Sequence, residues 1–334
     1  MIHLIVLVLI FLSMVVGMQG SQKTALITGA TGQDGFYLAQ QLVSNGYKVV
    51  GTSRTYNGWM PIGVGQKIQI LANAYTIESL RQTISDIAPD FIFNLAGQSY
   101  VSRSWDLINE TLDSQGLLIS RILQALEQSP RDIKLLNMTS AEIFDHSLDT
   151  QFDENSPTKP YNPYGCAQLL GYNLINVYRD IKNVWAANAI LFPHESIRRS
   201  EGFLFQKILK AAKNISEGNE QQLTIGNLKT IRDWGYAPIY MEGVLAQSQL
   251  QNPTDFCFCT GQAYSVEQIL ERAFSNYGLD YNNHILIDNK LVRNYEPQLS
   301  FGNCKKAKQL LKWNYSLDGL TVVDKIGELM CSGE

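Results

Sequence analysis

Residues 24–35 read TALITGATGQDG, a short apolar run that passes directly into a turn containing three glycines. Residues 36–45 then have the apolar spacing of an amphipathic helix, and Gly46 is a residue type that commonly ends one. The glycines permit a tight turn and a close approach of the backbone, and the start of a helix offers unpaired N–H groups to a pyrophosphate. This strand, turn and helix therefore predict the first unit of a dinucleotide-binding fold.

Apolar runs of strand length alternate with helical segments as far as residue 192. Strands are expected at residues 48–52, 91–95, 134–138 and 186–192, and helices at residues 76–87, 109–127 and 164–179. Alternation at this spacing implies right-handed βαβ units and a parallel sheet covered by helices. We therefore expect an α/β protein with a Rossmann-type, doubly wound parallel sheet.

After residue 192 this regular order ends. A helix at residues 203–215, a helix near residues 322–330, and loops with short strands indicate a smaller, discontinuous α/β substrate lobe. The expected organisation is an apolar leader at residues 1–20, an NAD(P)-binding Rossmann domain at residues 22–192, and the substrate lobe mainly at residues 193–330, with some segments returning to the Rossmann domain. No Pro- or Ser-rich linker separates the two parts, so they should share an interface.

The composition describes a globular protein and excludes several classes of partner. The chain has 334 residues, 45% of them hydrophobic, and a net charge of −4 with acidic and basic residues interspersed. Because no basic block is present, nucleic-acid binding is not expected. The five cysteines show no C-x-x-C pair or other metal-ligand spacing, so no metal site is expected, and reduced thiols fit the cytoplasm.

Residues 2–18 are almost entirely apolar and resemble the core of a signal peptide or a short membrane span. They lack the Lys or Arg residues of a signal sequence, no clear small-x-small cleavage site follows, and the first strand begins at Thr24. We expect a cytoplasmic protein whose residues 1–18 are a translated upstream extension or a weak anchor, with secretion or membrane anchoring as the alternative. Membrane contact is expected only if this leader is retained.

The end of the second strand distinguishes two cofactors. NAD-binding proteins usually carry Asp or Glu there to bind the ribose 2′-hydroxyl, whereas residues 51–54 read GTSR. The guanidinium fork of Arg54 suits a 2′-phosphate. The sequence therefore favours NADP as the cofactor, with NAD as the alternative.

Residues 164–168 read YGCAQ and resemble the Tyr-x-x-x-Lys catalytic element of the short-chain dehydrogenase/reductase superfamily, with Gln168 in the place of the lysine. Positions four apart lie on one face of a helix, so the two side chains should reach the same ligand. A free tyrosine has a pKa of about 10 and needs a nearby cation to act as a base near neutral pH. Gln168 can donate a hydrogen bond but carries no charge.

Four further segments extend this resemblance. Residues 25–35, 94–101, 194–199 and 226–235 read ALITGATGQDG, NLAGQSYV, HESIRR and GNLKTIRDWG, and the similarity runs from about residue 24 to residue 330. Together they resemble the GDP-mannose 4,6-dehydratase family. The resemblance implies an NADP-dependent lyase that acts on GDP-mannose or a related sugar nucleotide and forms homo-oligomers. In that chemistry C4 is oxidised, water is eliminated across C5 and C6, and hydride returns to C6, so the cofactor is recycled.

The resemblance also implies roles for individual residues. Tyr164 is the expected base at O4, Glu142 takes the C5 proton, and Ser140 offers a hydroxyl to O4, with Gln168 completing the catalytic set. The expected cofactor-binding residues are Gly29, Thr31, Gly32, Gln33, Asp34, Gly35, Arg54, Asn73, Leu95, Ala96, Gly97, Gln98, Ser99, Tyr164, Gln168, His194 and Arg199. The expected substrate-binding residues are Lys207, Arg232, Arg293 and Glu296.

Several of these residues also have readings without a ligand. Glu142 could be an acid that stabilises a helix start, His194 a hydrogen-bonded core histidine, and Arg199 a solvated charge. The catalytic region also departs from the family at Gln168 and at Pro193, where the family has an asparagine. These departures predict a slow enzyme. The alternatives are a non-catalytic protein that binds the nucleotide or sugar nucleotide, and a related epimerase or reductase.

Overall fold

The computed structural model describes residues 22–73, 75–148, 150–292 and 296–332. The expected leader at residues 1–20 lies outside these ranges. Within them, no helix combines the length and the apolar character that crossing a membrane requires.

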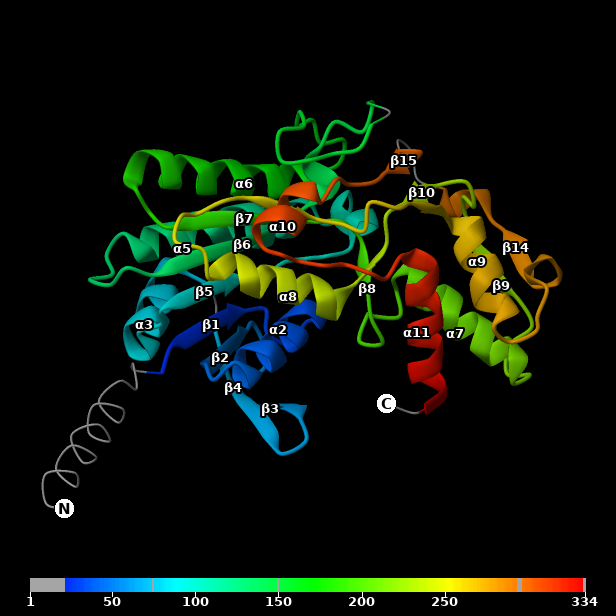
Figure 1. Ribbon diagram of the computed structural model, residues 1–334, viewed down its shortest axis with the longest axis horizontal. Coiled ribbons are helices and arrows are strands. Elements are labelled where there is room, and N and C mark those ends of the chain that lie inside the picture. Colours follow the sequence, from blue (N-terminus) through cyan, green and yellow to red (C-terminus); the bar gives the residue numbers. More distant parts are fainter. Residues whose placement is uncertain (1–21, 74, 149, 293–295, 333–334) are drawn as a thin grey trace, which may run out of the picture.

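An eight-stranded sheet forms the centre of the fold, with the strand order β12-β7-β6-β5-β1-β2-β4-β3 (Figure 1). Every neighbouring pair is parallel except β3 with β4. The strand order runs outward in both directions from β1, which is the doubly wound arrangement expected from the sequence. The strands are β1 (Thr24–Thr28), β2 (Lys48–Ser53), β3 (Gly58–Gly63), β4 (Gln66–Ala72), β5 (Phe91–Asn94), β6 (Lys134–Ser140), β7 (Ala186–Leu191) and β12 (Phe256–Phe258).

Helices cover both faces of this sheet. Helices α2 (Gln33–Ser44) and α8 (Ala237–Ser248) pack together over one face, and α3 (Ile77–Ile87), α5 (Leu118–Leu126) and α6 (Pro163–Lys182) cover the other. In β1, Ala25 and Ile27 belong to the apolar core under α2 and α8, and Leu26 belongs to the core under α3 and α5. Alternate residues of a strand point to opposite faces, so both faces must be apolar, and this explains the continuous apolar runs.

A ladder of hydrogen-bonded, buried polar side chains crosses the central strands. Thr28 Oγ1 donates to Asn94 Oδ1 at 2.7 Å, Asn94 Nδ2 donates to Asn137 Oδ1 at 3.0 Å, and Asn137 Nδ2 donates to Asn188 Oδ1 at 3.1 Å. Buried polar groups are costly unless they are hydrogen-bonded. The ladder therefore favours one alignment of β1, β5, β6 and β7.

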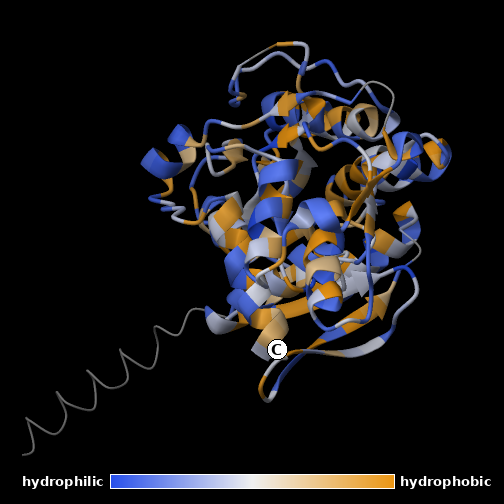
Figure 2. Cartoon of the chain, turned by 90° about the vertical axis from the view of Figure 1, so that its right-hand side faces the viewer, coloured by the Kyte–Doolittle hydropathy of each residue, from blue (hydrophilic) through white to orange (hydrophobic). Residues whose placement is uncertain are grey.

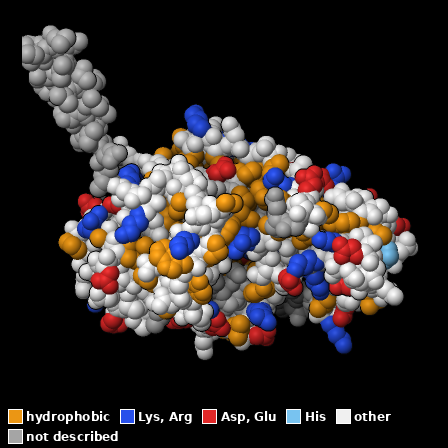
Figure 3. Space-filling model, turned by 90° about the horizontal axis from the view of Figure 1, so that it is seen from below, with side chains coloured by type: hydrophobic (Ala, Val, Ile, Leu, Met, Phe, Trp, Pro, Cys, Tyr) orange, Lys and Arg blue, Asp and Glu red, His pale blue; other side chains and the backbone are white. Residues whose placement is uncertain are grey.

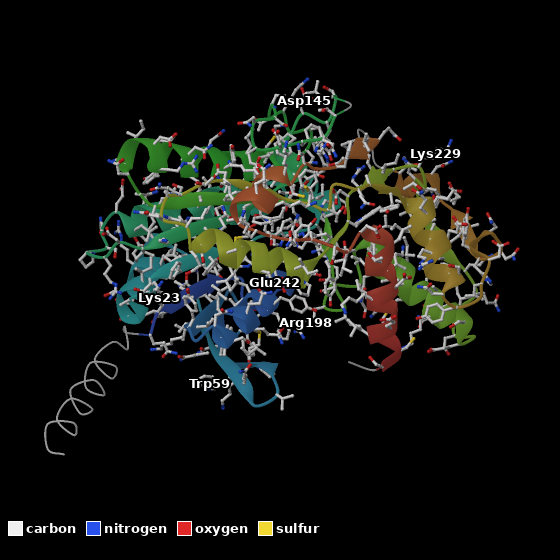
Figure 4. All side chains as sticks on the ribbon, viewed as in Figure 1. Lys23, Trp59, Asp145, Arg198, Lys229 and Glu242 are labelled. Atoms are coloured by element: carbon white, nitrogen blue, oxygen red, sulfur yellow. The ribbon has the colours of Figure 1, made fainter. Side chains whose placement is uncertain are left out.

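The β3–β4 hairpin at the sheet edge was not predicted, because residues 53–75 were assigned no strand. Its antiparallel edge strand makes the sheet mixed instead of wholly parallel. Gly58 and Pro61 in β3 are poor strand formers, but an edge strand tolerates proline because one side of it needs no N–H donor. Figure 4 shows Trp59 on this projecting hairpin, where its side chain is exposed and Lys67 Nζ lies 5.0 Å from the ring centre.

Three predicted boundaries differ from the structure in ways that position the site. Helix α2 begins at Gln33, inside the glycine turn, because Gly32 is its N-cap. Strand β6 continues to Ser140, two residues beyond the expected end. The helix expected at residues 109–127 is α4 (Ile108–Thr111), then a π-helical segment η2 (Leu112–Leu117), then α5.

A second lobe lies at the right of Figure 1 and has its own apolar core. Figure 2 shows hydrophobic and hydrophilic residues interspersed along its helices. Its helices are α7 (Leu204–Ser216), α9 (Val266–Ser275) and α11 (Gly319–Ser332), and its short strands are β8 (His194–Glu195), β9 (Leu223–Ile225), β10 (Ile231–Arg232), β11 (Gly235–Tyr236), β13 (Tyr264–Ser265), β14 (Ile285–Ile287) and β15 (Leu299–Ser300). The segments β12, α8 and α10 (Lys305–Leu310) come from the same part of the sequence but pack on the large sheet.

Candidate active site

A cavity of about 660 Å³ opens at the carboxyl ends of β5, β6 and β7, between the large sheet and the second lobe. Open parallel sheets bind their ligands at this edge. The expected site residues that line it are Asp34, Leu95, Ala96, Gly97, Ser99, Ser140, Glu142, Tyr164, Gln168, His194, Arg199, Lys207, Arg232 and Glu296. The expected residues outside its lining are Gly29, Thr31, Gly32, Gln33, Gly35, Arg54, Asn73 and Gln98, while Arg293 lies outside the described part of the chain.

Three of the four expected catalytic residues, Ser140, Glu142 and Tyr164, come from the end of β6, the turn after it and the start of α6. Ser140 ends β6, and its Oγ accepts a hydrogen bond from Glu142 N at 3.2 Å. Asn162 caps α6 by accepting from Gly165 N at 2.7 Å, which places Tyr164 in the first helical turn. The Glu142 carboxylate accepts from Tyr161 Oη at 2.5 Å and from Asn162 Nδ2 at 2.8 Å. These bonds fix the carboxylate beside the cavity.

The phenol of Tyr164 is rarely ionised in this setting. Burial and, to a lesser extent, the negative charge of Glu142 raise the pKa of Tyr164 to about 12. The Ser140 hydroxyl, the Arg199 guanidinium and the Gln168 amide lower the Tyr164 pKa, but they do not offset the effect of burial. Tyr164 is therefore protonated at neutral pH.

Gln168 is 5% exposed and belongs to a chain of amide hydrogen bonds. Its Oε1 accepts from Thr139 Oγ1 at 2.9 Å, and its Nε2 donates to Gln115 Oε1 at 2.8 Å. Gln115 Nε2 in turn donates to the Gln98 carbonyl at 2.6 Å. Both polar ends of Gln168 thus have protein partners, and Gln98 contributes to the site through its carbonyl, from behind the cavity wall.

Gln115 was not predicted, and it reaches the site through two local features. It lies in the π-helical segment η2, a type of irregularity that often occurs at functional sites. Its amide also lies against Gly97, where an added Cβ would come within 2.3 Å of it. A glycine at position 97 is therefore required for this packing.

The two most distinctive sequence segments bind each other. His194 Nε2 lies 2.9 Å from Asp34 Oδ2, and Ser196 Oγ donates to Gln33 Oε1 at 2.7 Å. His194 Nδ1 lies 2.7 Å from the carbonyl oxygen of Phe192, which can only accept a hydrogen bond. Both ring nitrogens of His194 therefore carry protons, and the imidazolium pairs with the Asp34 carboxylate.

The pKa shifts agree with this ion pair. Burial acts to lower the pKa of His194, but the Asp34 carboxylate outweighs it and raises that pKa above its ordinary value. Burial acts to raise the pKa of Asp34, but His194 and Arg199 hold that pKa below its ordinary value. The pair joins the glycine turn to the wall of the cavity, so His194 acts through Asp34 and not as an isolated core histidine.

Arg199 lies in the cavity wall and not on the surface. Its Nε is 3.4 Å from Glu195 Oε2, and its guanidinium lies 3.5 Å from the centre of the Phe203 ring. The Phe203 ring stacks on Tyr100 at 4.4 Å, and both aromatic side chains line the cavity. The neighbouring Arg198, labelled in Figure 4, instead covers the Phe36 ring of α2 at 3.6 Å.

The second lobe supplies charged groups to the other end of the cavity. Arg232 Nη2 lies 3.6 Å from Glu296 Oε1, and both side chains are largely buried. Lys207 Nζ donates to the Thr224 carbonyl at 3.2 Å. The lining here also includes residues to which the sequence gave no role: Gly226, Asn227, Thr230 and Trp234 of the family-like segment 226–235, and Ile225, Lys290, Leu291 and Val292 outside it. They lie on short strands and loops whose proximity depends on tertiary packing.

The expected adenosine end differs from the prediction. Asn73 is one of the expected cofactor-binding residues, but its side-chain oxygen accepts from Tyr75 N at 2.6 Å and from Ser79 Oγ at 2.9 Å. Arg54 is exposed and pairs with Glu110 at 3.3 Å. Tyr75, which the sequence did not indicate, also lies here, with its hydroxyl 3.3 Å from Gly29 N and 3.1 Å from Thr52 Oγ1.

Nothing in the described ranges resembles a metal centre. No group of three or more His, Cys, Asp or Glu side chains is arranged there to hold a metal ion, and the cysteines are free thiols. On the face shown in Figure 3, basic and acidic side chains are interspersed and form no basic block.

The sequence resembles one family over most of its length. A family model described as GDP-mannose 4,6 dehydratase matches residues 26–326. GDP-mannose 4,6 dehydratase 2 of Arabidopsis thaliana is 34% identical over 308 residues, an alignment that covers 87% of this chain and 82% of that protein.

Solved structures share the fold at lower sequence identity. The UDP-glucose 4-epimerase of Thermotoga maritima, in a structure with UDP-glucose, has a TM-score of 0.82 at 16% identity and covers 93% of this chain and 99% of its own. RMD from Pseudomonas aeruginosa, complexed with NADPH, has a TM-score of 0.76 at 17% identity and covers 92% of this chain and all of its own. At these identities the two structures establish the Rossmann-type fold.

Proposed function

This chain belongs to the GDP-mannose 4,6-dehydratase family, a family of lyases, and on that premise we propose that it converts GDP-mannose or a closely related sugar nucleotide to the 4-keto-6-deoxy product. The observation that carries the proposal is the meeting of Ser140, Glu142 and Tyr164 in one cavity with charged groups of the second lobe. The bound sugar nucleotide of the epimerase with the same fold supports the substrate class.

The cavity fits the nicotinamide end of a dinucleotide. Its walls are Leu95–Gly97 after β5 and Phe192–His194 after β7, with Tyr164 and Gln168 between them, so apolar walls carry a few convergent polar groups. When bound, the nicotinamide would take hydride from C4 of the sugar and later return it to C6. The NADPH complex of RMD supports a nicotinamide dinucleotide as cofactor. Arg54 favours NADP, because a 2′-phosphate would replace the Glu110 carboxylate as its partner.

The side chains of this chain would handle the protons. Tyr164 accepts the proton of the C4 hydroxyl, and the Ser140 hydroxyl orients that oxygen. The C4 ketone makes the C5–H bond acidic, and Glu142 accepts the C5 proton. Glu142 then returns this proton to the C6 hydroxyl, which leaves as water. When hydride adds to C6, the proton that Tyr164 took from O4 would be delivered to C5, so that Tyr164 returns to its starting state. The hydrogen bonds from Tyr161 and Asn162 hold the Glu142 carboxylate in place for both transfers.

The second lobe would bind the diphosphate and the nucleoside. Arg232 and Lys207 are cations that the second lobe contributes to the cavity lining, and arginine binds phosphate oxygens bidentately. A bound diphosphate would replace the Glu296 carboxylate as the partner of Arg232. Arg293 is a further proposed diphosphate partner.

Turnover should be slow. A tyrosine with a pKa of about 12 is almost wholly protonated at pH 7–8, and Gln168 supplies no charge to lower that value. The missing charge affects the base and leaves the cavity intact. The reaction should therefore be detectable over hours, and faster at alkaline pH.

One assay tests the proposal. Purified protein is incubated with NADP⁺ and GDP-mannose for many hours, and the 4-keto-6-deoxy product is detected by mass spectrometry as loss of one water. The expected result is product with the wild-type chain and none with Glu142→Gln. Absence of product from a wild-type chain that binds GDP-mannose would instead support the non-catalytic binding function.

The proposed assembly is a homo-oligomer. Leu170, Val177 and Ile181 recur along one side of α6 and are exposed, and Leu117 of η2 is exposed as well. Apolar side chains grouped on one helix face favour burial against a second copy of the chain. Light scattering should give a multiple of the 37.5 kDa chain, and Ile181→Glu should lower it.

A further inference from the structure

Tyr75 lies between β4 and α3, in a place that the catalytic steps do not explain. It is 7% exposed and belongs to a buried cluster that includes Leu80, Ile84 and Ala96. Its hydroxyl lies at the carboxyl edge of the sheet, where Gly29 N donates to it at 3.3 Å and Thr52 Oγ1 is 3.1 Å away.

This position coincides with the adenosine end of a dinucleotide site. In this fold the adenosine ribose lies between the glycine turn and the end of the second strand. Gly29 is the first residue of that turn, and Thr52 is on β2, two residues before Arg54. The Tyr75 hydroxyl contacts both, so it occupies the junction that a ribose would enter. The cavity correspondingly ends before Gly29, Arg54 and Asn73.

The backbone is arranged to place this tyrosine. Tyr75 has a φ of +55°, which is unusual for a bulky residue. Ala88 and Asn183 also have positive φ, but each ends a helix, where the left-handed conformation is common. Instead, Tyr75 N donates to Asn73 Oδ1 at 2.6 Å, which uses the side-chain oxygen of an expected cofactor-binding residue. The Tyr75 side chain thus occupies the adenosine end of the site, and its backbone N–H uses the side-chain oxygen of Asn73.

We propose that Tyr75 controls entry to the adenosine half of the cofactor site, and that a dinucleotide binds there only after the Tyr75 side chain turns out of it. The inference rests on the proposed nicotinamide cofactor. While Tyr75 is inside, its hydroxyl occupies the space beside Gly29 and Thr52 Oγ1 that a ribose would need, and Gly29 N donates to the Thr52 carbonyl at 3.0 Å as well as to this hydroxyl. The apparent affinity for adenosine nucleotides is then the intrinsic affinity multiplied by the fraction of molecules with Tyr75 outside. The cavity between the sheet and the second lobe is unaffected.

Calorimetric titration with ADP tests this directly, because ADP carries the adenosine and diphosphate without the nicotinamide. We compare the wild-type chain with Tyr75→Ala, Tyr75→Phe and the control Tyr281→Ala, in which the tyrosine removed bonds Glu267 on the second lobe. Tyr75→Ala should bind ADP about tenfold more tightly or better, because the closed state is removed. Tyr75→Phe keeps the ring, loses both hydroxyl contacts, and should gain about threefold. Tyr281→Ala should match the wild type.

Equal or weaker ADP binding by both Tyr75 variants would overturn the inference. Tyr75→Phe preserves the apolar ring and decides the question alone if the alanine variant does not fold, as judged by circular dichroism. Each protein is also titrated with GDP-mannose, whose affinity should be the same in all four. Failure of GDP-mannose to bind would count against the proposed substrate whatever the ADP result, so the two proposals fail separately.

Discussion

Replacing Gln168 with lysine should accelerate the reaction, because it places a positive charge beside a tyrosine that is too rarely ionised to act as a base. Residue 168 is one helical turn after Tyr164, and its side chain already approaches the phenol closely enough to lower the Tyr164 pKa slightly. The ammonium would donate to Gln115 Oε1 in place of the amide. Thr139 would lose the Gln168 Oε1 acceptor but could turn to the Gln168 carbonyl, 3.5 Å away.

The size of the effect follows from the Tyr164 pKa of about 12. At pH 8 roughly one molecule in 10⁴ carries the phenolate, since each pH unit below the pKa reduces the ionised fraction tenfold. A cation within about 4–6 Å lowers the pKa of an acid by about 1 to 3. The phenolate fraction, and with it the rate of C4 oxidation, should rise about 10- to 1000-fold, equivalent to about 1.4–4 kcal/mol.

The assay follows product formation from pH 6.5 to 9.5 in the wild type, Gln168→Lys and the uncharged control Gln168→Met. The wild-type rate should climb tenfold per pH unit throughout, whereas the lysine variant should be faster and level off at lower pH. The absorbance of the phenolate, measured against the same protein with Tyr164→Phe, reports the Tyr164 pKa without relying on activity.

Two results would refute this reasoning. If the introduced lysine leaves the Tyr164 pKa unchanged, the residue is not where the structure places it, or burial has removed its proton. If the Tyr164 pKa falls and the rate does not rise, the ionised fraction of Tyr164 does not limit turnover. Pro193, which replaces an amide-bearing residue of the family, would then be the next position to change.

Other changes probe separate parts of the site. Asp34→Asn should destabilise the protein by about 3 kcal/mol near pH 5.5, because it leaves the His194 charge buried without its partner. The raised His194 pKa contributes stability that is fully present below about pH 6.5 and is lost as the pH rises through the pKa of His194 in the folded protein. The lowered Asp34 pKa contributes stability that is present above about pH 4. In urea unfolding, the loss of stability in Asp34→Asn should therefore be smaller at pH 8. Glu142→Gln should reduce kcat by about 10²–10⁴-fold and, by removing a negative charge, lower the Tyr164 pKa; an unchanged kcat would exclude Glu142 as the C5 base. Gly97→Ala should lower the free energy of unfolding in urea by about 1–3 kcal/mol, because its Cβ would contact Gln115. The control Gly327→Ala, where nothing lies near the added Cβ on α11, should be neutral or stabilising, and equal effects of the two changes would contradict the packing argument.

Local signals in the sequence were sufficient for the fold. The glycine turn after β1 and the apolar runs of β5, β6 and β7 follow from steric and burial rules that act over a few residues. The hairpin at residues 58–72 was not predicted, because β3 contains Gly58 and Pro61. These residues are tolerated in a strand here because β3 lies at the edge of the sheet.

Short-range spacing was less informative about the site. Tyr164 and Gln168 could be paired because one helix carries both, and Glu142 follows Ser140 directly. Gln115 could not be paired with Gln168, because their contact depends on the packing of η2 against α6.

The sequence by itself determined the doubly wound sheet, the family and the residue types available for catalysis, because each is encoded by neighbours along the chain. Only the tertiary structure decided which of those residues share a cavity and what charges they carry. Burial beside Glu142 keeps Tyr164 protonated, the contact with Asp34 charges His194, and the position of Tyr75 puts its hydroxyl beside Gly29 at the adenosine end. Electrostatic fields and packing depend on distances in space, and those distances join residues that lie far apart in the sequence.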